Sequence, residues 1–111
     1  MKLRIPSAEL ALALQNAGGI VSAKSTLPVL ANVLLRAEHG ALTLVTTDLD
    51  RTLVQRVPCS VVQPGGTTVP VLRLGALIRC LEGEVELEAN DKNQLHVRCA
   101  ASNYKFHGLD V

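Results

Sequence analysis

Aromatic residues are nearly missing from this chain of 111 residues. It contains no tryptophan, and its single tyrosine and single phenylalanine, Tyr104 and Phe106, stand two positions apart near the end. Hydrophobic residues nevertheless make up 48% of the sequence, which excludes a disordered protein. The core must therefore consist of leucine, valine, isoleucine and alanine, and the length suits one domain with one core.

Cysteines and long apolar runs are also scarce. The three cysteines, Cys59, Cys80 and Cys99, are far apart and form no CxxC pair, so neither a disulfide framework nor a zinc site is predicted. No apolar run reaches the length of a membrane span. The first residues alternate between polar and apolar side chains and lack the apolar core of a signal peptide. We therefore expect a cytoplasmic protein with no membrane partner.

Neither sign of charge is in excess, because 11 basic and 10 acidic residues leave a formal net charge of +1. Such a balance predicts no long-range attraction to nucleic acid, so any contact with DNA must rely on a few well-placed cations. Phosphate-binding loops, nucleophile elbows and metal-ligand spacings do not occur in the sequence. These observations predict a protein without metal, without cofactor and without catalytic residues.

A row of glutamates is the one cluster of titratable residues. It consists of Glu82, Glu84, Glu86 and Glu88, which would share one face of a strand. Because no cation-binding motif accompanies them, a solvated face is favoured over an acid/base pair.

Hydrophobic periodicity predicts two successive series, each made of a strand, a helix and three further strands. In the first series these elements span residues 3–5, 8–17, 29–37, 41–46 and 51–57. In the second series they span residues 67–69, 72–81, 84–88, 95–99 and 103–107. Between the series, Gln63-Pro64-Gly65-Gly66 is the strongest break in the chain.

The repeated order of elements predicts an internal duplication, with halves of about 1–63 and 64–111. Chance is the alternative, because short β-rich patterns match one another easily. Each predicted helix has an apolar stripe that must cover a sheet, so the opposite faces of both helices would point outwards together. The predicted fold class is therefore α+β, a duplicated β-α-β-β-β unit with two helices packed on one side of antiparallel sheets.

Three motifs occur in order along the chain. The first is the run from Lys24 to Leu35, where a basic residue and Thr-Leu-Pro precede an apolar strand containing asparagine. The second is the run 39–44 followed by Thr-Asp-Leu-Asp at 47–50, and the third is Thr-Thr-Val-Pro at 67–70 followed by an apolar helix. Together, in this register, they resemble the first domain of the bacterial DNA polymerase III beta sliding clamps. The resemblance covers essentially the whole chain.

The resemblance implies a single DNA-clamp domain over residues 1–111, the first of three in the full-length family. In that family two chains close a ring whose helices line the hole and whose sheets form the outside. The implied function is that of a non-catalytic processivity factor, which slides on double-stranded DNA and tethers the polymerase. Implied partners are DNA polymerase III subunits and the clamp loader, through the full-length protein, and a second chain in a homodimer. The pocket for partner peptides would lie in later domains.

The resemblance also implies residues for DNA binding. Lys24, in the loop after the first helix, and Arg73, at the start of the second helix, stand at basic positions of the family. Arg79 lies opposite the apolar stripe of the second helix, so it faces solvent in any fold. Each of the three has the alternative of being an ordinary solubilising charge. No lysine or arginine occurs in residues 7–22. The first helix is therefore predicted to bring no positive charge to the surface that lines the hole of the ring.

Tyr104 and Phe106 occupy alternate positions of the last predicted strand and hence one face of it. The residues alone leave open a place in the core. The resemblance implies instead a place at the dimer interface, where the first domain of one chain meets the third domain of the other along an edge strand.

The sequence leaves two further hypotheses about function open. Val111 lies near the point where the family crosses into its second domain, so the chain is expected to be either the first part of a clamp or a stand-alone protein-interaction module with the clamp fold. A small enzyme is the third reading, and the absence of a catalytic constellation disfavours it.

Overall fold

A computed structural model describes residues 1–19, 32–47, 51–92, 94–99 and 102–107 of the chain. Within these ranges the chain forms nine strands and two helices. In chain order the elements are β1 (Lys2–Pro6), α1 (Ser7–Gly18), β2 (Asn32–Glu38), β3 (Ala41–Thr47), β4 (Thr52–Pro58), β5 (Ser60–Gln63), β6 (Gly65–Pro70), α2 (Val71–Ile78), β7 (Glu84–Ala89), β8 (Gln94–Cys99) and β9 (Ser102–His107).

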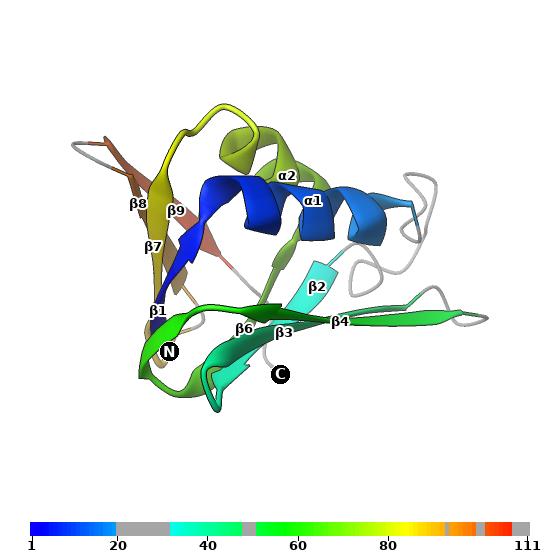
Figure 1. Ribbon diagram of the computed structural model, residues 1–111, viewed down its shortest axis with the longest axis horizontal. Coiled ribbons are helices and arrows are strands. Elements are labelled where there is room, and N and C mark those ends of the chain that lie inside the picture. Colours follow the sequence, from blue (N-terminus) through cyan, green and yellow to red (C-terminus); the bar gives the residue numbers. More distant parts are fainter. Residues whose placement is uncertain (20–31, 48–50, 93, 100–101, 108–111) are drawn as a thin grey trace.

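The strands form two antiparallel sheets. One has five strands in the order β5-β1-β7-β8-β9, and the other has four in the order β4-β3-β2-β6. Figure 1 shows the two sheets meeting at an angle, with α1 and α2 lying together in the space between them. The predicted α+β class, and the two helices on one side of antiparallel sheets, are thereby confirmed.

The two sheets share one internal arrangement. In each, three consecutive strands form a meander, and the strand beside the first of them comes from the other half of the sequence. Thus β1 pairs with β7, and β6 pairs with β2. The duplicated β-α-β-β-β unit is present, but each unit contributes its first strand to the sheet of the other unit. The position of the boundary between the halves stays a prediction.

One strand was not predicted. β5 follows β4 after the single residue Cys59, and it moves the chain from the edge of the four-stranded sheet to the edge of the five-stranded sheet. The predicted break at Gln63–Gly66 is present at Pro64, where the chain passes from β5 of one sheet to β6 of the other, but it is shorter than predicted, because Gly65 and Gly66 both belong to β6.

These glycines allow close packing of β6, at Gly65 against the N-terminus and at Gly66 against the neighbouring strand β2. A Cβ atom on Gly65 would lie 2.9 Å from the Met1 nitrogen, and one on Gly66 would lie 3.1 Å from the Leu35 carbonyl oxygen. Gly65 also has a φ of +155°, which other residues adopt only with strain. Glycine is therefore required at position 65, so that the start of β6 can pass close to the N-terminus.

Both helices begin directly after a proline that ends a strand. Pro6 and Pro70 occupy the N-cap positions of α1 and α2, with φ of −60° and −63°. The second helix ends at Ile78, three residues before the predicted end at Leu81. The backbone N–H groups of Cys80 and Leu81 bond to carbonyls only three residues back, and the reversal at Gly83 (φ +81°) then leads into β7.

The core contains no aromatic side chain among the described residues. Its largest fully buried side chains are all leucine, isoleucine or valine. They come from both sheets and both helices: Leu3, Ile5, Leu10, Leu14, Val33, Leu35, Leu42, Leu44, Leu74, Ile78, Leu87 and Leu95. Tyr104, by contrast, is 39% exposed, so the alternative of a core tyrosine is wrong.

Two leucines of α2 provide a matched test of this packing. Leu74 is fully buried, whereas Leu72 is 53% exposed on the same helix. We expect Leu74→Ala to lower the free energy of unfolding by about 2–5 kcal/mol, because it removes buried methyl groups and leaves a cavity. Leu72→Ala should cost roughly 1 kcal/mol or less. Urea unfolding of both variants measures the difference, and equal losses would contradict the described orientation of α2.

Candidate nucleic-acid interface

The two helices lie together in the angle between the sheets, and their outward faces form one continuous wall (Figure 1). They pack against each other at two glycines, where a Cβ atom would make only an ordinary van der Waals contact. A Cβ atom on Gly75 would lie 3.6 Å from the Cβ of Leu14, and one on Gly18 would lie 3.6 Å from a methyl group of Leu72. A groove of about 230 Å³ runs between the helices. The two helices are therefore in contact, with a shallow groove between them.

Hydrogen bonds anchor α1 to its surroundings along its length. Gln55 of β4 donates from its amide nitrogen to the Ala13 carbonyl oxygen (2.8 Å), and the Asn16 side chain donates to the Gln55 amide oxygen (3.2 Å). At the start of α1, the Ser7 backbone N–H donates to Gly83 (2.8 Å) and the Ser7 hydroxyl donates to Leu81 (3.2 Å). The start of α1 is thus fixed to the segment that follows α2.

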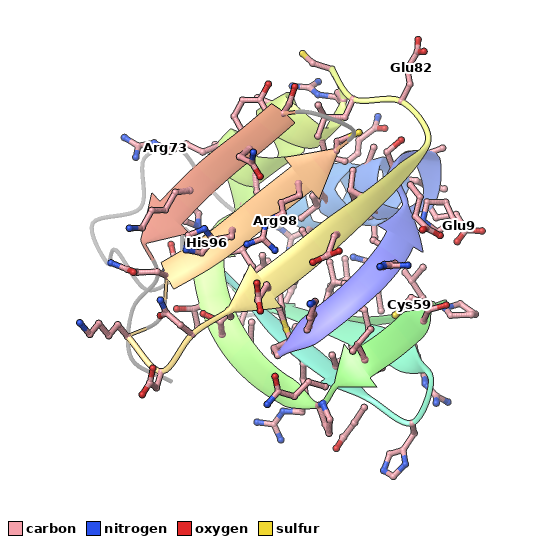
Figure 2. All side chains as sticks on the ribbon, turned by 90° about the vertical axis from the view of Figure 1, so that its left-hand side faces the viewer. Glu9, Cys59, Arg73, Glu82, His96 and Arg98 are labelled. Carbon is pink, nitrogen blue, oxygen red and sulfur yellow. The ribbon has the colours of Figure 1, made fainter. Side chains whose placement is uncertain are left out.

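The wall carries few charges. Its exposed side chains are Ala8, Glu9, Leu12, Gln15 and Asn16 of α1, Leu72, Arg73 and Ala76 of α2, and Arg79 and Cys80 directly after α2. Among them only Glu9, Arg73 and Arg79 are charged. Figure 2 shows Glu9 and Arg73 on opposite sides of the molecule. The described part of the wall therefore presents two cations and one anion to any ligand.

Two of the three predicted DNA-binding residues fall on this wall. Arg73 and Arg79 are exposed, and within the described part of the chain their side chains take part in no hydrogen bond or ion pair. Such cations are available to phosphate groups. Lys24 lies outside the described residues. The DNA-binding role of all three stays a prediction.

The predicted dimer interface coincides with the edge of the five-stranded sheet. β9 is the outermost strand of that sheet, and it places Tyr104 opposite Val97 and Phe106 opposite Leu95. Tyr104 is partly exposed, while the side chain of Phe106 lies outside the described residues. An edge strand of this kind offers backbone N–H and C=O groups to another strand. The interface role of both aromatic residues stays a prediction.

The outward face of the five-stranded sheet carries an ion-pair network (Figure 2). One guanidinium nitrogen of Arg98 lies 3.1 Å from a carboxylate oxygen of Glu86 and 2.9 Å from one of Glu88. Glu86 also lies 3.7 Å from the Lys2 ammonium and 3.6 Å from Nε of Arg4. The network joins β1, β7 and β8. Three of the chain's cations are thereby paired on the face away from the helix wall.

The predicted glutamate row is only partly correct. Glu82 precedes β7 and does not share its face, because the turn at Gly83 separates them. Glu86 and Glu88 are paired with cations, so this part of the face is more than a solvated row. The charge-assisted hydrogen bond from Arg98 holds the pKa of Glu88 below its usual value, with a smaller contribution from the Lys2 charge. The pairing of Glu86 and Glu88 with Arg98 of β8 could not be predicted from the sequence of β7 alone.

The cysteines are dispersed, and all three are free thiols. Cys99 is buried and its thiol donates to the Glu82 carbonyl (3.2 Å), Cys59 is half-buried, and Cys80 is exposed. Burial raises the pKa of the Cys59 thiol, which keeps it protonated. No group of three or more metal-binding side chains occurs among the residues that the structure describes.

The described helices are also too short or too polar to cross a lipid bilayer.

The ion-pair network predicts a change in one titration. We expect Arg98→Met to raise the pKa of Glu88 towards that of a free glutamate, since the principal stabiliser of the carboxylate is removed. A depressed pKa in the folded state adds stability above the unfolded pKa, and this contribution is lost as the pH falls through the folded pKa. NMR titration of the Glu88 side chain measures the shift. Arg36→Met, on the four-stranded sheet, should leave Glu88 unchanged; an unshifted Glu88 in R98M would contradict the assignment.

Comparison with known proteins places these features in a family. The family model described as "DNA polymerase III beta subunit, N-terminal domain" matches residues 1–111. The chain is 32% identical over 111 residues to the beta sliding clamp of Salmonella typhimurium. The aligned region covers 98% of this chain and 30% of that protein. It is 36% identical over 98 residues to the beta sliding clamp of Pseudomonas aeruginosa, covering 86% of this chain and 27% of that protein.

Solved structures agree with the sequence comparison. The crystal structure of the DNA polymerase III subunit beta from Pseudomonas aeruginosa is similar with a TM-score of 0.93 and 32% identity, covering 100% of this chain and 31% of that one. The sliding clamp from Bacillus subtilis has a TM-score of 0.94 at 21% identity, which supports the fold alone. The chain thus spans about 30% of the length of the relative from Salmonella typhimurium. By its sequence over all 111 residues and by its fold, the chain belongs to the family of the DNA polymerase III beta subunit, in its N-terminal domain.

Proposed function

We propose that the chain acts as one segment of a DNA sliding clamp, the first of three domains in a chain whose homodimer closes a ring around duplex DNA. The ring would keep the replicative polymerase on its template in the cytoplasm. The observation that supports this most is the helix wall: α1 and α2 lie side by side on one surface, with antiparallel sheets behind both of them (Figure 1).

The sparse charge of the wall suits a sliding tether. A closed ring holds DNA by topology, so it does not need contacts to base edges, which would stop it at one sequence. Contacts with phosphates, direct or through water, are sufficient to centre the duplex. Arg73 and Arg79 offer such contacts from the described wall, and Lys24 is proposed as a third. A net charge of +1 leaves the rest of the surface without strong attraction to DNA.

The proposed role is mechanical and includes no catalysis and no cofactor. It is supported by the dispersal of possible nucleophiles, because Cys59 follows β4, Cys80 follows α2 and Cys99 lies at the end of β8. A nucleophile needs a base within hydrogen-bond reach. The only thiol hydrogen bonds given by the described residues go to backbone carbonyls, of Ala76 and Glu82.

The proposed partners follow from the same ring. Double-stranded DNA occupies the hole, and polymerase III subunits and the clamp loader act through the full-length protein. A second chain closes the ring at β9, where Tyr104 and Phe106 are proposed to meet the third domain of the partner. Such a contact would continue the five-stranded sheet across the subunit boundary.

Topological retention tests the proposal. We expect a chimera, in which this chain replaces the first domain of the Pseudomonas aeruginosa relative, to stay on circular duplex DNA after loading and to leave when the circle is cut once. The reason is that a ring can leave only over an end. Gel filtration of labelled protein with DNA before and after cutting measures retention.

The unmodified relative is the control for loading. Equal loss of the chimera from intact and cut circles would contradict a ring role for this chain, provided that the control is retained on the intact circle.

The dimer contact is tested by Phe106→Asp in the same chimera. A carboxylate at an apolar subunit contact loses its hydration without gaining a partner, so we expect the mass in solution to fall from dimer to monomer. Asn103→Asp, on the opposite face of β9, is the matched control and should remain dimeric. Light scattering gives the mass, and thermal unfolding checks that both variants fold. A folded F106D dimer would exclude the contact.

A further inference from the structure

We propose that the outward face of the four-stranded sheet is a docking surface for an acidic amphipathic helix of another protein. The helix would lay its apolar stripe on a row of aliphatic side chains and place two carboxylates next to Arg36 and Arg56. This inference goes beyond the proposed function and does not depend on it. In the proposed ring the sheets face outwards, so the surface would remain open to a partner.

A row of aliphatic side chains crosses the strands of this sheet. The strand register pairs Val54 of β4 with Val45 of β3, and it pairs Val45 with Leu34 of β2. Thr68 of β6 continues the row beyond Leu34. Val54 is 62% exposed, while Val45 and Leu34 are half-buried and point outwards, because the residues on either side of each in its strand are buried. Since neighbouring strands lie about 4.8 Å apart, the row is about 14 Å long.

Two exposed arginines border one side of the row. Arg36 of β2 and Arg56 of β4 lie on either side of Thr43 in the register, two residues along the strands from the aliphatic row. Neither arginine forms an ion pair with a described residue, and Arg56 donates one hydrogen bond to the His39 carbonyl oxygen (3.3 Å). Glu38 is the only acidic residue in the four strands of this sheet, and it lies 4.0 Å from the His39 ring. Both guanidinium groups are therefore available to pair with carboxylates of a partner.

The outward face of the five-stranded sheet has a different chemistry. There the register places Glu86 between Arg4 and Arg98. It also places Glu88 beside Lys2. The resulting ion pairs satisfy the charges of that face internally. The fold gives the two outward faces equivalent places, so the unpaired arginines and the aliphatic row of the four-stranded sheet are a property of the surface and not of the fold.

A helix suits this face better than an extended segment does. The backbone groups of β2 and β3 pair within the sheet, so a strand laid on the face would leave its own N–H and C=O groups without partners. A helix satisfies its backbone internally and offers an apolar stripe. The inner face of the same sheet is already covered in this way by α1, which contacts β3 and β4 (Figure 1). About nine residues of helix would span the row.

The positions of the arginines determine where the partner needs its charges. Arg36 and Arg56 are two strands apart, hence about 10 Å apart at their backbones. Two glutamates seven positions apart on a helix share one face and are also about 10 Å apart. A second copy of this chain offers no such helix, because Glu9 is the only acidic residue of α1 and α2 has none. Duplex DNA would supply phosphates but no apolar surface for the row.

NMR mapping with a designed peptide tests the inference. The probe is a helical peptide of about 18 residues with leucines along one face and two glutamates, seven positions apart, on its flank. We expect it to shift the amides of Leu34, Val45 and Val54 and the Nε–H signals of Arg36 and Arg56 in the ¹⁵N-labelled chain. A peptide with glutamine at both charged positions should bind about fivefold more weakly or worse, since each exposed ion pair contributes a factor of about two to five. No shift at millimolar peptide, equal shifts on the five-stranded sheet, or equal binding of both peptides would overturn the inference.

Variants of the surface supply the second readout. Val54→Glu should weaken peptide binding about tenfold or more, because it removes an apolar contact and repels the glutamates. Arg36→Gln and Arg56→Gln should each weaken it about two- to fivefold. Val62→Glu and Arg4→Gln are the matched controls and should bind normally, since Val62 is 60% exposed and Arg4 is exposed on the five-stranded sheet. Thermal unfolding checks that each variant folds, and equal binding by folded V54E and V62E proteins contradicts the inference.

Two other occupants of the surface would give different results. A second copy of the chain would shift the same amides when the protein concentration is raised without peptide. Duplex DNA that binds this face would displace the peptide from the row. Either result would overturn the inference. Retention of the chimera on circular DNA is measured without the peptide, so failure of this inference is distinguishable from failure of the proposed clamp role.

Discussion

The exchange of first strands between the two units is the constraint on which the rest of the structure depends. β1 is held between β5 and β7, and β6 closes the edge of β2. Because Pro6 and Pro70 join these strands directly to α1 and α2, the exchange carries each helix into the angle between the two sheets. Within its own half β1 has only the short strand β5 as a partner, and β6 has none, so the two halves bury their apolar surface together.

This interlocked core divides the surface into two electrostatic regions. The outward face of the five-stranded sheet pairs its cations with glutamates, and Arg98 bridges two of them. The helix wall keeps Arg73 and Arg79 without such partners among the described residues. A chain of net charge +1 can thus offer local positive charge at one wall without a general affinity for nucleic acid. The proposed clamp role uses this separation.

Local signals in the sequence predicted most of the elements and part of the site. The His39-Gly40 turn adopts the left-handed angles that a tight hairpin needs, with φ of 52° and 72°, and Arg79 is exposed as its helical phase indicated. Contacts between distant segments were not predictable. Residues 60–63 form β5 because β1 pairs with them. The backbone at Gly65 continues into β6 while passing close to Met1. Neither contact can be predicted from the residues that are adjacent in the sequence.

Residue type and periodicity are sufficient to predict the aliphatic core, the two helices, the repeated order of elements and the scarcity of cations. The sheet that receives each first strand, the end of α2 and the pairing of charges become known only from the folded chain. It placed Glu9 and Arg73 at opposite sides of one wall, and it brought Arg98 to Glu86 and Glu88 across neighbouring strands. The physical reason is that strand pairing and side-chain burial depend on contacts between residues far apart in the chain, which local periodicity does not encode.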